Sequence, residues 1–315
     1  MKTTTTSGPG ATVWLLLFVL GLLWGGSFFF ARIAVAQVPP FTLVFVRLAL
    51  AALALHVYLS GRFDVYPLLK QHWRSFAVLG LINNAIPHTL IFFGQTEIGA
   101  GLAAILNATT PIFTVLIANR FTEDEKLSAA KIVGCLLGLA GTVVLIGPGV
   151  FTATAAPLWA LLLPVLAALS YGFAATYGKR FRTLPAPVTA TGQLTASSMM
   201  MLPLMLLVDQ PWMLTFPSLA VVGVILALAL LSTAFAYLLY FRILALAGAT
   251  YASLVTLLVP PSAILLGVVF LHERLDVAEI GGMVLIGLGL LVLNGMLKIG
   301  TRSPSAKTRV PVPDR

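Results

Sequence analysis

The sequence predicts an all-α membrane protein with ten transmembrane helices, arranged as two inverted five-helix repeats with both termini in the cytoplasm. The first observation is composition, because 59% of the 315 residues are hydrophobic and only 9% are charged, whereas a soluble domain carries about 25% charged residues. A chain with so few charges cannot cover a surface that faces water, so we expect lipid around it. The other two observations are a series of long apolar stretches and an internal repeat.

Ten apolar stretches predict ten spanning helices, because about 20 apolar residues suffice to cross a bilayer. The first stretch is longer than the apolar core of a cleaved signal peptide, so we expect it to be retained. The connections are short, which favours antiparallel neighbours. The predicted spans are Thr12–Ala31, Phe41–Leu59, Ser75–Gly94, Ile98–Asn119, Leu127–Gly147, Leu158–Tyr177, Val188–Val208, Leu219–Phe241, Ala249–Leu271 and Val277–Leu297.

The positive charges predict the orientation of these helices. With the N-terminus in the cytoplasm, nearly every lysine and arginine outside the spans falls in a cytoplasmic segment, and the other side holds only Arg32 and Arg274. Such an excess is typical of cytoplasmic loops. We therefore expect a multi-pass plasma (inner) membrane protein with cytoplasmic tails over residues 1–11 and 298–315, the second of them basic and disordered.

The internal repeat relates residues 12–147 to residues 158–297. The segment Ala103–Pro111 resembles Ala252–Pro260, and Glu125–Ser128 resembles Glu273–Asp276. Because each half holds an odd number of spans, the second copy must lie upside down relative to the first, an arrangement typical of secondary transporters. After the acidic segments, Gly134, Gly141 and Gly147 align with Gly282, Gly289 and Gly295.

Five short motifs are spread along the apolar part of the chain. They are Trp24-Gly25-Gly26-Ser27-Phe28, Pro39-Pro40 with Arg47, Ala234-Phe235-Ala236-Tyr237 with Phe241-Arg242, Gly248-Ala249, and Leu271-His272-Glu273-Arg274-Leu275. Together they resemble the drug/metabolite transporter superfamily, specifically its EamA-like ten-helix permeases. The resemblance covers residues 12–297 and implies a central cavity between two EamA-like repeats. Members move amino acids, other metabolites, nucleotide sugars or drugs, so the resemblance implies no single substrate.

Prolines and one intramembrane charge indicate where the site lies. Pro111 and Pro260 occupy equivalent repeat positions, and a proline within a span frees backbone carbonyls, so we expect both to be gating kinks beside a midplane site. Arg47 lies inside the second span, where a charge costs several kcal/mol unless it reaches the interface or faces a cavity. Both positions for Arg47 stay open from the sequence.

Polar side chains in mid-span predict the lining of the cavity, since polar groups are poorly tolerated against lipid. His88 can change its charge near neutral pH, which makes it the candidate for proton coupling, although an interhelical hydrogen bond would also explain it. Tyr171, Tyr177 and Tyr240 could stack on a substrate, but tyrosines near span ends are typical interface anchors. The candidate substrate-binding residues are Trp24, Arg47, Asn84, His88, Gln95, Asn107, Thr110, Gln193, Ser197, Ser232, Tyr237 and Thr256.

The sequence carries no motif for a cofactor, a metal or catalysis. It has no phosphate-binding loop, no Cys/His metal spacing, and its one cysteine, Cys135, is expected to pack as a small apolar residue. Its basic residues lie in short loops, which excludes a nucleic-acid face. The acidic cluster Glu123–Glu125 is expected to lie in a solvated loop, so that alanine at all three positions should leave transport intact.

These features predict a secondary transporter that works as an exporter. They do not predict an enzyme. The expected substrates are small organic metabolites, with amino acids or related compounds favoured by the resemblance, and efflux would occur by alternating access of the central cavity. A membrane enzyme acting on lipid and a passive channel are the alternatives. The expected partners are the small-molecule substrate and the lipid bilayer, and the sequence leaves a homodimer open.

Overall fold

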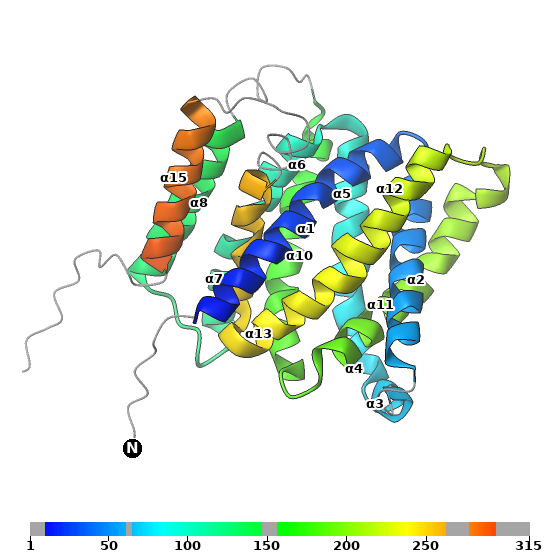
Figure 1. Cartoon of the computed structure of the whole chain (residues 1–315), viewed down its shortest axis with the longest axis horizontal. Coiled ribbons are helices and arrows are strands. Elements are labelled where there is room, and N and C mark those ends of the chain that lie inside the picture. The colour runs from blue at the N-terminus through cyan, green and yellow to red at the C-terminus, as the bar shows by residue number, and fades with distance from the viewer. Residues whose placement is uncertain (1–9, 61–64, 147–155, 263–276, 294–315) are drawn as a thin grey trace, which may run out of the picture.

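A computed structural model describes residues 10–60, 65–146, 156–262 and 277–293, and within these ranges every regular element is a helix (Figure 1). The first half contains α1 (Ala11–Val35), α2 (Pro40–Leu59), α3 (Val65–Gln71), α4 (Trp73–Gly80), η1 (Leu81–Ala85), α5 (Ile86–Glu97), α6 (Ala100–Asn107), α7 (Thr110–Phe121) and α8 (Ala129–Ile146). The second contains α10 (Leu158–Gly178), η2 (Lys179–Phe181), α11 (Ala186–Leu204), η3 (Met205–Asp209), η4 (Pro211–Met213), α12 (Leu219–Ala229), η5 (Leu230–Phe235), α13 (Ala236–Ser253) and α15 (Val277–Leu293).

Seven helical stretches in the described ranges are long and apolar enough to cross a membrane. One of them, Leu219–Ser253, joins the predicted eighth span to the start of the ninth across Gly248, whose backbone is not helical. The shorter apolar helices Ala129–Val144 and Ile280–Leu293 lie in the predicted fifth and tenth spans. The rest of the ninth span, after residue 262, lies outside the described residues, so the predicted count of ten stays a prediction.

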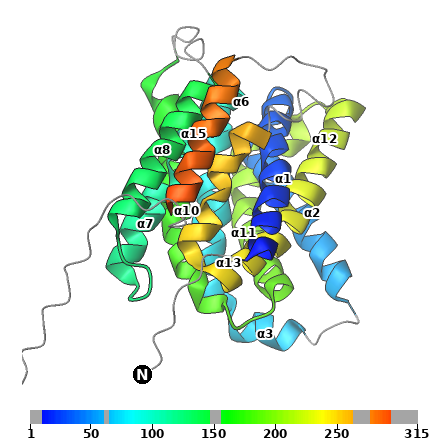
Figure 2. The ribbon, with the colours of Figure 1, turned by 60° about the vertical axis from the view of Figure 1, so that its left-hand side comes forward.

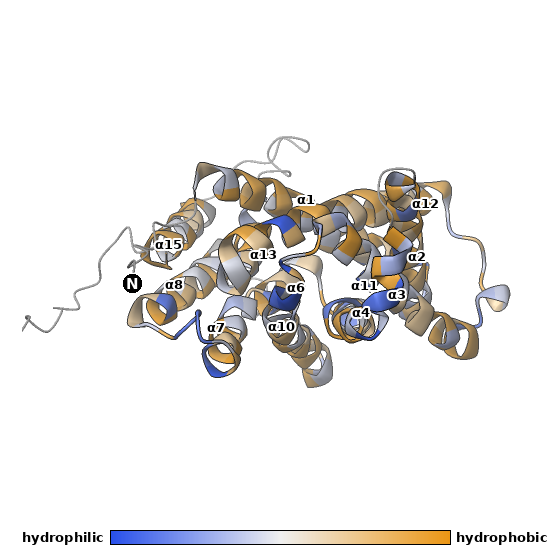
Figure 3. Ribbon diagram, turned by 90° about the horizontal axis from the view of Figure 1, so that it is seen from below, coloured by the Kyte–Doolittle hydropathy of each residue, from blue (hydrophilic) through white to orange (hydrophobic). Residues whose placement is uncertain are grey.

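The outer surface of the bundle is apolar, as a lipid-facing surface requires. Leu207, Phe216 and Leu219 are each more than 70% exposed, and orange, hydrophobic ribbon dominates the outside of the helices when the bundle is viewed from below (Figure 3). In water such a surface would be an aggregation hazard. The apolar surface and the seven long helices define a multi-pass membrane protein.

Two π-helical turns interrupt the helices that carry the polar residues. They begin at Leu81 and Leu230, and the spacing between them equals the spacing between Pro111 and Pro260. A π-helical turn adds a residue to the helix and leaves carbonyl groups free for side-chain donors, and such turns are frequent at functional sites. The carbonyl oxygen of Ser232, in η5, accepts from both Trp24 and Arg47.

Helices α8 and α15 lie side by side at one flank of the bundle (Figures 1 and 2). A Cβ atom at Gly134 would lie 2.7 Å from the carbonyl oxygen of Gly289, and one at Gly141 would lie 2.8 Å from the carbonyl oxygen of Gly282. The two backbones can approach so closely because glycine has no side chain. The glycines that align in sequence, Gly134 with Gly282 and Gly141 with Gly289, therefore contact each other crosswise.

Replacing Gly134 by alanine should weaken this helix pair. The new methyl group would meet the backbone of Gly289 and the side chain of Leu293, and overpacking of this kind costs about 1–3 kcal/mol. We expect a corresponding loss in the free energy of unfolding, measured by SDS titration in mixed micelles. Gly223→Ala is the matched control, because its Cβ would meet nothing within 4 Å; equal effects of the two substitutions would show that the close approach does not matter.

Candidate functional site

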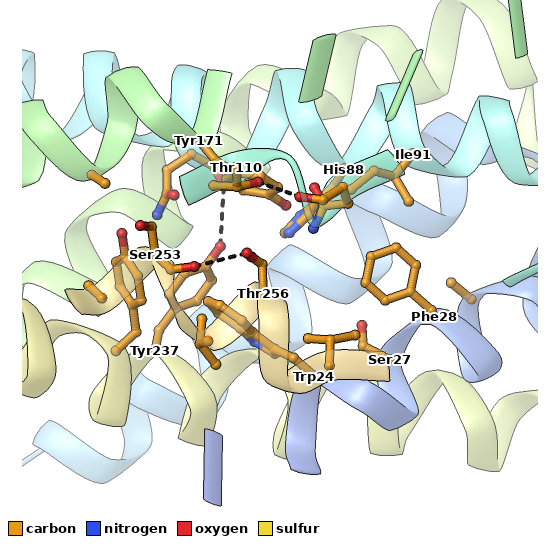
Figure 4. Close-up of a pocket in the computed structure, with 18 of the residues that line it drawn as sticks. Trp24, Ser27, Phe28, His88, Ile91, Thr110, Tyr171, Tyr237, Ser253 and Thr256 are labelled. Carbon is orange, nitrogen blue, oxygen red and sulfur yellow. Dashed lines mark hydrogen bonds between the residues drawn. The ribbon is translucent and has the colours of Figure 1, made fainter. Parts of the chain in front are cut away.

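A cavity lies in the middle of the bundle, lined by residues from α1, α2, α5, α6, α10 and α13 among others (Figure 4). The volume of the cavity is about 60 Å³. A cavity needs about 10–15 Å³ on this measure to hold one water. In this conformation the space therefore suits a few waters or a small solute. Trp24 and Tyr237 lie on one side of it, and His88, Thr110 and Tyr171 lie on the other.

Arg47 is the charged residue of the cavity lining, and its side chain is only 4% exposed. Its Nε atom donates to Oγ1 of Thr233 at 2.7 Å, and its Nη2 atom donates to the carbonyl oxygen of Ser232 at 3.4 Å. The guanidinium lies 5.7 Å from the centre of the Phe92 ring. Of the two positions open for Arg47 from the sequence, the structure places it at the cavity.

Aromatic side chains form a wall of the cavity. The Trp24 ring lies 6.1 Å from the Tyr237 ring and 5.7 Å from the Tyr240 ring, and its indole Nε1 donates to the carbonyl oxygen of Ser232. Tyr171 approaches His88 edge-on at 6.5 Å. Rings at these separations stabilise one another, so the wall is held in place without a ligand. The lining tyrosines Tyr171 and Tyr240 are thus not the interface anchors that their positions near span ends suggested.

Three buried polar atoms beside the cavity have no hydrogen-bond partner among the described residues: Nδ1 of His88, Oε1 of Gln95 and Oδ1 of Asn107. For Gln95 the assignment of the amide is fixed, because its Nε2 donates to the carbonyl oxygen of Phe28 at 2.9 Å, which leaves Oε1 as the free acceptor. Buried polar groups are nearly always paired in proteins. A ligand or water would therefore donate to the free oxygens of Gln95 and Asn107, whereas Nδ1 of His88 donates or accepts according to its tautomer.

Eight of the predicted substrate-binding residues lie in the lining: Trp24, Arg47, His88, Gln95, Asn107, Thr110, Tyr237 and Thr256. Asn84, Gln193, Ser197 and Ser232 are buried but lie outside it. Asn84 accepts from the Tyr237 hydroxyl at 2.6 Å and donates to Ser197, while Gln193 accepts from Asn83 at 2.9 Å. These hydrogen bonds hold the Tyr237 hydroxyl in place. Ser232 donates to the carbonyl oxygen of Leu23.

Other lining residues were absent from the predicted set. Ser27 and Phe28 belong to the quoted motif of the first helix, which was the available signal for them. Asn83, rather than its neighbour Asn84, reaches the cavity, and both lie in the π-helical turn η1. Phe92 and Ser253 are of types so common in membrane helices that nothing in the sequence marked them.

The two prolines predicted as gating kinks occupy different local structures. Pro111 follows the break between α6 and α7, at the first turn of α7, where its missing N–H costs nothing. Pro260 lies inside the helical residues 255–262, and the break in that stretch comes earlier, at Leu254. Their expected role in gating stays a prediction.

Glu125 is buried, which corrects the expected solvated position of the acidic cluster. Its carboxylate accepts from the backbone N–H groups of Ala249 and Thr250, both at 2.8 Å, and from the Thr250 hydroxyl. Lys179 lies 3.0 Å from Glu125 and 2.5 Å from Asp124. Within the cluster, Glu123 and Asp124 are the exposed members. We call Glu125, Lys179, Gly248, Ala249 and Thr250 the latch.

The latch lies at the end of the bundle where α1 begins, because α7 and the first part of α13 both end there (Figures 1 and 2). Gly248 has φ 86° and ψ 179°, so the chain turns sharply and exposes the N–H groups of the next residues to Glu125. An anion is favoured at such a helix start. Ala252 and Ser253, a few residues further on, line the cavity, so the latch lies beside one end of it.

The ion contacts of the latch shift the acidity of its carboxyl groups. Burial would raise the pKa of Glu125, but the hydrogen bonds from Thr250, Lys179 and Ala249 outweigh burial and lower the pKa below its usual value. The hydrogen bond from Lys179 lowers the pKa of Asp124. Both carboxyl groups are therefore held in the charged form.

An apolar helical bundle around a partly polar cavity is typical of the transporter class of multi-pass membrane proteins. The EamA-like transporter family matches residues 12–147 and 158–295, and the chain belongs to that family. The predicted resemblance to the EamA-like permeases of the drug/metabolite transporter superfamily is confirmed.

Relatives that are named as transporters support the same class. The chain is 27% identical over 285 residues to the "Uncharacterized transporter YoaV" of Bacillus subtilis, covering 89% of this chain and 96% of that protein. It is 30% identical over 175 residues to the "Uncharacterized inner membrane transporter YedA" of Escherichia coli, covering 55% of each. The crystal structure of another protein aligns with this chain at a TM-score of 0.73 and 24% sequence identity. The alignment covers 90% of this chain and 96% of the other chain, which shows a shared fold.

Proposed function

We propose that this chain is a secondary transporter that exports small organic metabolites across the inner membrane, with amino acids or related compounds as its substrates. The observation that carries the proposal is the cavity, which lies within an apolar bundle and combines a buried cation, aromatic rings and acceptors that have no partner among the described residues. Both matched segments contribute to it, with Arg47 and His88 from the first and Tyr171 and Tyr237 from the second. A binding site between two halves suits a carrier.

Two arrangements support alternating access by inverted repeats. The crosswise contacts of the aligned glycines in α8 and α15 are those that a two-fold relation between antiparallel helices would produce. The π-helical turns at Leu81 and Leu230 stand at matching positions of the two halves. The latch would then hold one end of the cavity shut, and its opening would expose the cavity to the side on which the chain begins, the cytoplasm in the predicted orientation.

Counterflow in proteoliposomes tests the transport function directly. Vesicles that contain the purified full chain would be loaded with pooled amino acids and metabolites, and labelled compounds would be offered outside. We expect saturable uptake of one compound class that is faster than in empty vesicles and that depends on the internal load. Single-channel currents without counterflow would replace the carrier by a channel, and complete silence across the pool would count against transport of these compounds.

His88 is the proposed proton-coupling residue, because its Nδ1 has no hydrogen-bond partner in the described part of the chain and its ring lines the cavity beside Arg47. The substitution His88→Ala should reduce load-dependent exchange much less than flux driven by a pH gradient, since exchange needs no net proton movement. It should reduce flux driven by a pH gradient at least tenfold, on the order expected for loss of a proton-transfer group. The two fluxes would be compared from pH 5.5 to 8; a pH-gradient response that survives in the variant would remove this role from His88.

A further inference from the structure

We propose that Arg47 recognises the transported compound by binding its carboxylate, so that a carboxylate is obligatory for binding and an ammonium group is dispensable. The inference rests on the proposed function and narrows it, because it makes organic acids without an amino group ligands of the same cavity. It also excludes amines and esters that share the rest of the amino-acid structure.

The contacts of Arg47 hold its guanidinium in a fixed plane and leave most of its donors free. Of the five N–H groups of an arginine, one donates to Thr233 and one to Ser232 within the described part of the chain. The ring of Phe92 lies 5.7 Å away. A planar guanidinium with two adjacent free donors matches a carboxylate, which it can bind through two parallel hydrogen bonds.

The charge of Arg47 is not balanced by the residues around the cavity. None of the described lining residues is acidic, and both ion pairs recorded in the described ranges belong to Lys179 of the latch. Asp209, the carboxylate of η3, instead accepts from the backbone N–H and the hydroxyl of Thr42. A buried charge without a partner is costly, and the carboxylate of a ligand would supply the missing anion.

The cavity offers an ammonium group much less. The acceptors free to receive it, Oε1 of Gln95 and Oδ1 of Asn107, are neutral. The described lining residues include no carboxylate, so a buried ammonium would lose its hydration without forming an ion pair, which is costly. An ammonium group would therefore gain little binding free energy beyond the hydration that it loses on leaving water. A hydroxyl or a water molecule would donate to the same acceptors without burying a charge.

The proposal is tested by calorimetric binding to the purified full chain in detergent, which does not require transport. The ligands share one side chain, chosen as that of the L-amino acid giving the largest heat among the twenty. They are the amino acid, its deaminated acid, its methyl ester and the corresponding amine, with inorganic phosphate as a second anion. We expect the deaminated acid to bind within about tenfold of the amino acid, while the ester, the amine and phosphate bind at least tenfold more weakly.

Variants of Arg47 separate recognition from a structural role. Arg47→Gln should weaken binding of both acids on the order of 10–100-fold, the loss of a charged hydrogen-bond pair, and Arg47→Lys should lie between it and the wild type. Without ligand the glutamine variant should be no less stable to heat than the wild type, because it removes an unbalanced buried charge. Arg74→Gln, an exposed position, is the control.

The outcomes distinguish this proposal from the transport function. Equal binding of the ester and the acid, unchanged binding in Arg47→Gln, tight binding of phosphate, or no binding of any acid would overturn it, even where counterflow of another compound class succeeds. If counterflow fails while the acids bind in an Arg47-dependent way, the carboxylate site stands and the transport function falls. Should Arg47→Gln not fold, the ligand series on the wild type and on Arg47→Lys decides.

Discussion

Replacing Gly248 by alanine is expected to destabilise the protein by about 3 kcal/mol and to abolish most transport. Gly248 has φ 86° with ψ 179°, a backbone conformation that is essentially restricted to glycine and costs about 1–3 kcal/mol for other residues. In addition, the new methyl group would lie 2.7 Å from Oε1 of Glu125. The substitution therefore strains the chain and displaces the carboxylate that binds it.

The two costs of Gly248→Ala can be separated by a double-mutant cycle, with unfolding followed by SDS titration in mixed micelles. If overlap with Glu125 accounts for part of the loss, Gly248→Ala combined with Glu125→Ala should cost less than the sum of the single substitutions. Gly223→Ala serves as the control, since a Cβ at that position meets nothing within 4 Å. Strict additivity would assign the whole effect to the backbone at Gly248.

The lining of the cavity could be predicted in part, because polar groups inside an apolar span must face away from lipid. That argument found Arg47, His88, Gln95 and Asn107, which all reach the cavity. It selected Asn84, whereas the neighbouring Asn83 lines the cavity, since the π-helical turn at Leu81–Ala85 changes which side chain points inward. Helical periodicity assumes a regular helix, and nothing in the local sequence announced this turn.

The latch could not be predicted because its parts are far apart in the sequence. Glu125 follows two other acidic residues in a short loop, a pattern typical of a solvated surface. Its partners Ala249 and Thr250 are backbone donors that become available only because the chain breaks its helical path at Gly248. Which donors lie free at the end of a helix depends on the tertiary fold rather than on residue type.

Glu125→Ala is expected to lower the free energy of unfolding by about 3 kcal/mol, because it leaves two buried backbone N–H groups without their acceptor and removes one of the two carboxylates that pair with Lys179. Glu125→Gln keeps one carbonyl oxygen but turns an amide N–H₂ toward the same donors, so its loss should be intermediate. Glu123→Ala, an exposed neighbour, should stay within about 0.5 kcal/mol of the wild type. A loss in Glu123→Ala equal to that in Glu125→Ala would contradict the buried role.

The same carboxylate should make stability depend on pH in a defined direction. Contacts with Thr250 and Lys179 hold the pKa of Glu125 below its value in the unfolded chain, and the pKa of Asp124 is lowered likewise. The two carboxylates therefore contribute their full stabilisation above the pKa of a carboxyl group in the unfolded chain, roughly pH 4. This stabilisation is lost as the pH falls from there through the lower pKa values of the folded protein. Lys131 and Lys179 are the cations near them.

This pH dependence separates the charge of Glu125 from its shape. Between about pH 6 and pH 3, the wild type should lose more unfolding free energy than Glu125→Gln, because the variant has no proton to gain at that position. Transport should follow the same order if the latch closes one end of the cavity, since each variant that weakens it also weakens the closed state that alternating access requires. If the wild type and Glu125→Gln lost the same unfolding free energy over this pH range, the charge of Glu125 would contribute nothing to stability. Its side chain would then hold the chain at Gly248 through hydrogen-bond geometry alone.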